Sequence, residues 1–564
     1  MKKYFFIITL TITTAIAIAS LDANYLQEKS IMKSREFLKP IIWPFNLEMN
    51  LTYNQIIQGK IEHPLQIGTV TVKYFLEAMF NNKTEYIKRG EELLHILDNY
   101  AYKKEKSDSV IYLYNQDHGS LKAKKWWSGM ANSSIALAYL YGYEITKKEK
   151  YKISAIKAIN GVIQSIKENG SAVKLDHNST WYLEYAENKS NIKNSKFVLN
   201  GFQYSLLVLK IFQEKLKSQI YNNAYEKGIN AFKKFSKEFY YPDNSWIYYM
   251  KNPLTIESVH YAIFDNMLLK SLAMYDKKNR DFLQNELRKR KNILKKHYNL
   301  EKYSDGTYLF SAIGVPHPYW IDLRPTELRI YYNNSHQKKI EITPKNFNQK
   351  ISKRAFIFID ANESKEIDFI EIFQKHNGYN DKIFTTKNKD IIYVDDNQIL
   401  PKVIEASKNY LHDAYSDNNN SYIKLYQDKT SKAVIQFILK TPINLWEKKY
   451  FLVFINSAID LDAIRIILFD IEGKTSERYY LPQKSGNNLI LLSALGFKNQ
   501  NINHKIKEIR FYLYAKKNNT KKALINLSKL FYMDSKRALY ELLKKNDESN
   551  NSLFHFQEKR PKSH

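Results

Sequence analysis

A pattern of paired helices recurs along the first half of the chain and constrains its fold more than any other feature. In each copy an apolar helix and a short polar turn precede an amphipathic helix, whose apolar residues recur every three or four positions. Copies begin about 60–70 residues apart, a spacing typical of stacked helical hairpins. The predicted pairs are Val70–Phe80 with Glu85–Leu97, Asn132–Tyr143 with Lys150–Ile166, Gly201–Phe212 with Asn222–Phe235, and Tyr261–Tyr275 with Asn279–Leu294. Pairs closing in a ring predict an α/α toroid, which we expect over residues 24–300.

Long connections separate these helix pairs, and a ring would bring them all to one end. They span residues 100–131, 167–200 and 236–260. Loops on a rigid scaffold are the usual place for a functional site. The connections hold Trp126, Trp127, Glu184, Tyr185, Trp246, Tyr248, Tyr249 and Lys251. We therefore expect Glu184, Tyr185, Asn200, Tyr248 and Lys251 to line one cleft.

Short runs of β-branched and aromatic residues with turn residues between them replace the helical pattern after about residue 300. They predict a small β-sandwich over residues 313–400 and a second over 401–535, which looks like a jelly-roll carbohydrate-binding module. The fold class is therefore multidomain α + β, a toroid followed by β-sandwich domains. The clearest predicted strands are Thr326–Tyr332, Ala355–Ile359, Lys432–Leu439, Ala463–Asp470 and Glu508–Tyr514.

The two ends of the chain differ from its body. Two lysines precede an apolar run that ends in Ala17-Ile18-Ala19, which is typical of a signal peptide. An uncleaved membrane anchor is the alternative, and in both cases residues 1–23 predict export, to the periplasm, the cell surface or the medium. Residues 536–564 are polar and predict a disordered tail.

The formal net charge is +29, which favours a polyanionic partner. Such a partner could be an acidic polysaccharide, a nucleic acid or an anionic membrane. No nucleic-acid-binding motif accompanies the charge, so no nucleic acid is expected, and a homodimer is left open. Scattered lysines could also reflect composition alone. The chain has no cysteine, which excludes disulfides and thiolate metal sites. No metal-ligand spacing and no phosphate-binding loop is present in the sequence, so no cofactor is expected.

The stretch from Trp181 to Phe202 concentrates residues suited to acid–base chemistry on a sugar. It opens with Trp181, Tyr182, Glu184 and Tyr185, continues through a polar loop, and closes on a helix start that reads VLNGF. A packing role is the alternative, since the chain has 43 tyrosines. In a straight strand Glu184 and Tyr185 would point to opposite sides, so a shared site requires the backbone to turn there.

The motifs WYxEY and VLNGF resemble the C-terminal catalytic domain of D-glucuronyl C5-epimerases and their bacterial relatives. Trp127-Ser128-Gly129-Met130-Ala131 is similar to a helix start of that family, and the resemblance runs from roughly Pro64 to Leu272. It implies a uronic acid C5-epimerase acting on a polysaccharide, with Glu184 and Tyr185 in catalytic positions. Trp127, Trp181 and Tyr182 are expected to bind the sugar.

The resemblance also extends to the last helix pair, with two departures. The segment 246–251 matches a family motif in which Tyr248 is functional, and Lys251 replaces an arginine that would contact the substrate. Asn200 matches the family asparagine and could hydrogen-bond the sugar. His260 matches a family histidine, but Val259 occupies the place of a catalytic tyrosine, so Tyr261 or His260 would have to substitute.

Epimerisation requires a base to remove the C5 proton, an acid to return one on the opposite sugar face, and a group that stabilises charge on the carboxylate. Glu184 suits the first role, a phenol such as Tyr248 or Tyr261 the second, and Lys251 the third. A lyase is the alternative within enzymes that share this proton abstraction. A glycoside hydrolase would need a second carboxylate, Glu257 or Asp265. A non-catalytic polysaccharide-binding protein is a further alternative.

Overall fold

A computed structural model describes most of the chain between residues 40 and 537. The predicted signal peptide or anchor and, apart from Arg537, the predicted tail lie outside the described residues. The residues described are 40–42, 49–81, 83–103, 108–116, 121, 125–188, 190–240, 246–252, 255–257, 259–297, 299–311, 326–333, 336–342, 356–359, 367–376, 379–387, 392–394, 402–418, 420–427, 430–444, 450–480, 485–492, 502–515, 521–533 and 537.

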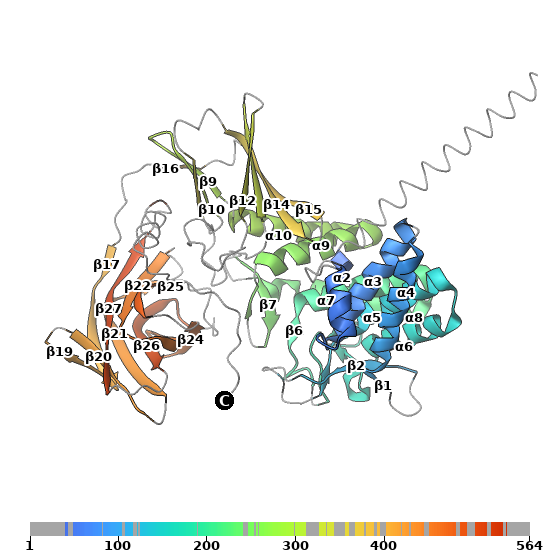
Figure 1. Cartoon of the computed structure of the whole chain (residues 1–564), viewed down its shortest axis with the longest axis horizontal. Helices are drawn as coiled ribbons and strands as arrows, with labels where there is room; N and C mark the ends of the chain where they lie inside the picture. The colour runs from blue at the N-terminus through green and yellow to red at the C-terminus, as the bar shows by residue number, and fades with distance from the viewer. Residues whose placement is uncertain are drawn as a thin grey trace, which may run out of the picture. The chain divides into compact units, whose positions relative to one another are not determined.

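The chain divides into two compact units. Unit 1 consists of Met1–Lys237 and Phe264–Lys289, and unit 2 consists of Glu238–Ile263 and Arg290–His564. The division passes through the last helix pair, so α9 (Val259–Tyr275) and α10 (Arg280–His297) each contribute residues to both units. Helices dominate the residues before about 298 and strands those after it (Figure 1), which confirms the predicted order of a helical region followed by β-sheets.

Helical hairpins form the body of unit 1. Consecutive helices contact each other within three pairs, and α5 also contacts α3 and α7, which ties the pairs into a row. The observed bounds extend the predicted helices by a few residues at most ends. The helices are α2 (Met49–Ile57), α3 (Pro64–Asn81) with α4 (Thr84–Asp98), α5 (Gly129–Thr146) with α6 (Glu149–Ile163), and α7 (Leu199–Leu216) with α8 (Gln219–Phe235).

The first helix of each of these pairs is buried on nearly all sides, and the second buries one face. Helices α3, α5 and α7 bury most of their apolar residues and also polar ones such as Thr71, Ser133 and Ser205. Helix α8 instead buries residues such as Tyr221, Ala224 and Tyr225, at helical spacing, and exposes its lysines. An all-round apolar helix must be enclosed, whereas an amphipathic helix covers it from outside. The described start of each enclosed helix after α3 follows a connection that holds short strands.

The short strands of unit 1 occupy the predicted long connections. Strand β2 pairs with both β1 and β3, and β4 pairs with β5, all antiparallel. The strands are β1 (Ala101–Tyr102), β2 (Ile111–Tyr114), β3 (Trp126–Trp127), β4 (Ala172–Lys174), β5 (Thr180–Tyr182) and β6 (Phe197–Val198).

Two four-stranded sheets occupy the first β-rich part of unit 2. One has the order β12-β11-β14-β15 and the other β13-β10-β9-β16. The second sheet begins before residue 313, the predicted start of the small β-sandwich. Its strands β9 and β10 are joined by a tight turn at Asp305 and Gly306, with Gly306 at φ 80°. The strands are β9 (Asn299–Tyr303), β10 (Tyr308–Ser311), β11 (Thr326–Tyr332), β12 (Gln337–Ile342), β13 (Phe356–Ile359), β14 (Ile367–His376), β15 (Tyr379–Lys387) and β16 (Ile392–Val394).

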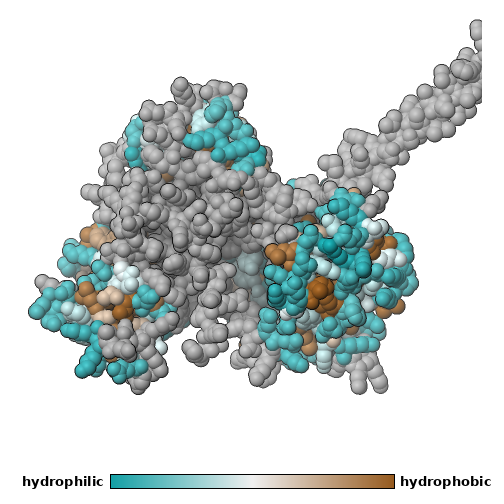
Figure 2. Space-filling view, viewed as in Figure 1, coloured by the Kyte–Doolittle hydropathy of each residue, from teal (hydrophilic) through white to brown (hydrophobic). Residues whose placement is uncertain are grey.

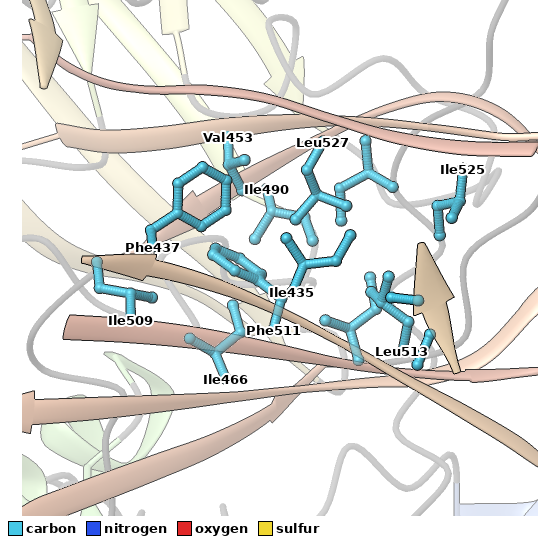
Figure 3. Packing of buried hydrophobic residues seen from close by; sticks show 14 of the residues in the cluster. Ile435, Phe437, Val453, Ile466, Ile490, Ile509, Phe511, Leu513, Ile525 and Leu527 are labelled. Atoms are coloured by element: carbon cyan, nitrogen blue, oxygen red, sulfur yellow. The ribbon is translucent and has the colours of Figure 1, made fainter. Parts of the chain in front are cut away.

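Two antiparallel sheets in the C-terminal part of unit 2 share one hydrophobic cluster. Figure 3 shows its side chains, among them Phe437, Ile466, Phe511 and Leu527, packed together between strands. Each fully buried Ile, Leu or Phe stabilises the fold by roughly 1.5–3 kcal/mol before entropy is subtracted. The strands are β17 (Lys402–Ile404), β18 (Ala406–His412), β19 (Ala414–Asp417), β20 (Asn420–Lys424), β21 (Ser431–Asn444), β22 (Tyr450–Ser457), β23 (Leu461–Asp470), β24 (Thr475–Tyr480), β25 (Gly486–Leu492), β26 (Lys505–Ala515) and β27 (Lys522–Met533).

Hydrophilic side chains cover much of the described surface that faces the viewer in Figure 2. Lysines and glutamates contribute many of them, as in the exposed pair Lys440–Glu405. Among the helices of the described residues, none has the length and apolarity that crossing a bilayer requires.

Candidate functional site

The segment that reads WYLEYA is attached to the start of helix α5, so two motifs distant in the sequence pack together. Trp127 and Ala186 exchange two backbone hydrogen bonds of 3.0 and 2.9 Å. The Gly129 N–H donates to the Leu183 carbonyl oxygen at 2.9 Å. A Cβ at Gly129 would lie 2.5 Å from that oxygen, so only glycine permits this approach. The helix-start motif therefore positions the backbone on both sides of Glu184.

Glu184 lies across the first turn of helix α7. The backbone bends at Glu184, which meets the condition for Glu184 and Tyr185 to serve one site. A Cβ at Gly201 would lie 2.3 Å from Oε2 of Glu184 and 2.7 Å from its Cβ. The glycine of VLNGF thus provides the space that the glutamate side chain of WYLEY occupies. The carboxylate is largely buried, with 8% of the residue exposed.

Tyr114 and Trp126 form an aromatic platform beside this carboxylate. They are paired residues of β2 and β3, and their rings stack at 3.9 Å between centroids with an angle of 12°. The half-buried Tyr185 ring meets Trp126 edge-on at 5.8 Å. Leu65 donates its backbone N–H to the Tyr114 hydroxyl at 3.2 Å, which fixes the phenol against the start of α3. Tyr114 was not among the predicted site residues; its signal in the sequence is the short strand Ile111-Tyr112-Leu113-Tyr114, in which aliphatic and aromatic residues alternate.

Glu184 and Tyr185 both adjoin this platform. Burial raises the pKa of Tyr114 strongly, and the negative charge of Glu184 raises it further. Tyr114 therefore stays a neutral hydroxyl near the Glu184 charge, and Tyr185 contacts Trp126, the other ring of the platform. The structure thus brings together the two residues of WYxEY that the sequence singled out for catalysis.

His63 adjoins the same platform and was also missed by the sequence analysis. Its ring meets Tyr114 edge-on at 5.0 Å, and its Nδ1 accepts the Gln66 backbone N–H at 3.3 Å. Burial lowers the pKa of His63 to about 4, so the ring is neutral near pH 7. His63 directly precedes helix α3, as Ser128 precedes α5 and Val198 precedes α7. That shared position at a helix start is the signal that could have identified it.

Three aromatic residues predicted to bind sugar are buried inside unit 1. Trp127 donates its indole N–H to the Gly170 carbonyl oxygen at 3.1 Å, and Tyr182 donates its hydroxyl to the Ala224 carbonyl oxygen at 2.7 Å. Trp181 stacks on Phe202 at 3.8 Å. With exposed fractions of 1–2%, these side chains pack in the interior and hold the segment in place, and their predicted contact with a sugar stays a prediction.

Asn200 occupies the first turn of helix α7, next to the glycine that Glu184 contacts. It is buried, and its Oδ1 accepts the Gly201 N–H at 2.7 Å. This local bond fixes the orientation of the amide at the helix start. The predicted hydrogen bond from Asn200 to a sugar stays a prediction.

The remaining predicted residues belong to unit 2. Tyr248 and Lys251 are on strand β7 (Tyr248–Lys251), which pairs with β8 (Thr255–Ile256); Tyr248 is 4% exposed. Lys251 forms an ion pair with Glu238. Tyr261 is 38% exposed and its ring stacks on Tyr249 at 5.2 Å.

Trp246 and His260, two further residues considered for the site, also belong to unit 2. Trp246 donates its indole N–H to the Glu257 carbonyl oxygen at 2.8 Å. His260 lies in the first turn of α9, and its side chain is outside the described residues. The cleft that was expected to join these residues with Glu184 stays a prediction.

Glu184 and Tyr185 thus lie near stacked aromatic rings and near the starts of enclosed helices, and a carboxylate and a phenol are groups suited to acid–base chemistry. Residues 106–292 match the family model of the D-glucuronyl C5-epimerase C-terminus. The family model that matches is the one predicted from WYxEY and VLNGF, which confirms that resemblance over these residues. No curated protein matches the chain.

Several solved structures resemble part of the chain. One is an unsaturated glucuronyl hydrolase from Bacillus sp. GL1, described as responsible for glycosaminoglycan degradation; identity is 11%, the TM-score 0.34, and coverage 44% of this chain and 67% of that one. An unsaturated glucuronyl hydrolase from Streptococcus agalactiae shows 14% identity and a TM-score of 0.30 over 44% of this chain and 63% of that one. A GH76 α-mannanase from Bacteroides thetaiotaomicron shows 10% identity and a TM-score of 0.31 over 41% and 57%.

Proposed function

We propose that the protein is a C5-epimerase of uronic acid residues in an acidic polysaccharide. The observation that carries the proposal is the gathering of Glu184 and Tyr185 on the Tyr114–Trp126 platform, within the region that matches the epimerase family. The positive net charge of +29 supports a polyanionic substrate. Export of the protein, and continuation of the helix pairs into a closed α/α toroid followed by β-sandwiches, belong to the same proposal.

Glu184 exchanges the C5 proton on one face of the sugar, with Tyr185 assisting. The C5–H bond breaks, its electron pair spreads onto the adjoining carboxylate, and reprotonation on the other face completes inversion. A phenol, Tyr248 or Tyr261, is the proposed proton donor for that other face. Because Lys251 already pairs with Glu238, a substrate carboxylate would have to compete for it, so we retain Lys251 as a contact to the polymer.

The alternatives differ in what happens after proton abstraction. A lyase would expel the 4-linked sugar and leave an unsaturated product. A glycoside hydrolase would rely on Glu257 or Asp265 as a second carboxylate, and both residues are fully buried, with 0% exposed.

The test is incubation of uronate polysaccharides with the protein in deuterated water, followed by NMR at C5. Deuterium uptake without chain cleavage supports the epimerase. An unsaturated product would identify a lyase instead, and binding without exchange would favour the non-catalytic alternative.

A further inference from the structure

Lys196 is a buried lysine that the sequence analysis assigned to a polar loop. Only 8% of the residue is exposed, and its Nζ has no hydrogen-bond partner within the described part of the chain. Lys210 is buried to the same extent, but Gln213 and Glu214 hold its ammonium at 3.0 and 3.2 Å. Lys196 therefore differs from a lysine that serves structure alone.

The surroundings of Lys196 only partly compensate its charge. Burial lowers its pKa, and the negative charge of the nearby buried Glu187 offsets part of that effect without reversing it. A buried ammonium without hydrogen bonds costs free energy, and it is retained where an anion completes its surroundings.

The backbone places Lys196 directly opposite Tyr185. The two residues form an antiparallel bridge, so their side chains lie on the same face with Cβ atoms about 5 Å apart. The Tyr185 ring contacts Trp126, and Trp126 stacks on Tyr114. The lysine thus shares a face with the aromatic platform and with the phenol of WYxEY.

The chemistry of a uronate makes this neighbourhood informative. C5 is bonded directly to the carboxylate carbon, so the group that exchanges its proton and the cation that holds its carboxylate must be neighbours. We propose that the Lys196 ammonium binds the carboxylate of the uronate whose C5 proton is exchanged, an assignment that rests on the proposed function. As the C5–H bond breaks, its electron pair moves onto that carboxylate, where the lysine stabilises the added charge.

Lys251 is the cation that the family resemblance would favour for this role. In this chain it is paired with Glu238, whereas Lys196 has no such hydrogen-bonded partner among the described residues. The two lysines therefore have different roles: Lys196 binds the carboxylate of the reacting sugar, and Lys251 helps to attract the polymer.

The experiment compares Lys196→Met with Lys193→Met, an exposed lysine of the same segment that removes the same charge. The probes are a uronate polymer that the unmodified protein turns over and the same polymer with its carboxylates reduced to alcohols. Lys196→Met should weaken binding of the charged polymer and raise its KM by roughly 30-fold or more, with little change for the reduced polymer. Lys193→Met should change both by less than about twofold.

A second variant keeps the lysine and alters its neighbour. Glu187→Gln removes the competing negative charge, so it should tighten binding of the charged polymer and leave the reduced polymer unaffected. This readout decides the question even if Lys196→Met does not fold.

Three outcomes separate the two claims. Unchanged KM and unchanged preference for the charged polymer in both variants would overturn the assignment of Lys196. Lys196-dependent binding without any C5 exchange by the unmodified protein would refute the proposed function and leave the carboxylate site standing. Absence of binding and exchange on every uronate polymer would overturn both.

Discussion

Replacing Gly201 with alanine tests whether the position of Glu184 matters to the chemistry. The added Cβ would lie 2.3 Å from Oε2 of Glu184, and ordinary contact begins at 3.4 Å, so the carboxylate must move by about 1 Å. A displacement of that size in a reacting group costs roughly 10²-fold in rate. Overpacking should lower stability by about 1–3 kcal/mol, partly offset by about 1 kcal/mol from the better helix propensity of alanine.

The assay is the rate of C5 deuterium exchange at saturating substrate, with the thermal unfolding midpoint measured alongside. Gly90→Ala is the matched control, because Gly90 lies on helix α4 and its Cβ would meet only the ring of Phe75 on helix α3, at 2.6 Å, among its nearest atoms. It should lose similar stability and keep its exchange rate. If Gly201→Ala folds and exchanges at the rate of Gly90→Ala, the contact between Glu184 and helix α7 has no catalytic meaning.

Two further predictions concern stability and pH. Burial raises the pKa of Asp276, but hydrogen bonds from Tyr225 and Asn279 lower it more, so its pKa in the folded chain lies below the usual value. Asp276→Asn should therefore lower the free energy of unfolding by about 2 kcal/mol at pH 7. The difference between the variant and the unmodified chain should vanish as the pH falls below about 4, where Asp276 takes up a proton. Burial lowers the pKa of His63 to about 4, so the folded chain should lose stability as the pH falls from about 6.5 toward 4. His63→Asn retains an acceptor for the Gln66 N–H and cannot take up this proton. Urea titrations at each pH should therefore show that the variant lacks this part of the stability loss. A pH-independent difference between His63→Asn and the unmodified chain would contradict the second prediction.

The helical pairs could be predicted from sequence because their signal is local. The continuous apolar run of α5, the helical spacing of apolar residues in α8 and the polar turns between helices are all properties of neighbouring residues. Strands β9 and β10 were missed because Asn299–Tyr303, which reads NLEKY, has no regular alternation of polar and apolar residues and directly follows the charged end of α10. Strand β10 also pairs with β13, about fifty residues later, which no local pattern shows.

The candidate site likewise combines residues that the local sequence identifies with contacts that only the fold creates. Glu184 and Tyr185 could be selected from their residue types and from the family resemblance. The close approaches at Gly129 and Gly201 join segments more than fifteen residues apart, so no local pattern predicts them. Lys196 looked like part of a polar loop, because burial of a lysine depends on what folds over it.

Deuterium exchange at C5 by Glu184→Gln tests the central claim most directly. Glutamine keeps the shape that fills the space above Gly201 and cannot accept the proton as a carboxylate does. On a uronate polymer that the unmodified protein turns over, we predict that the variant binds nearly as tightly and that its exchange rate falls by about 10²–10⁴-fold. Exchange at a near-normal rate would contradict the account, and would leave WYLEY as a packing motif.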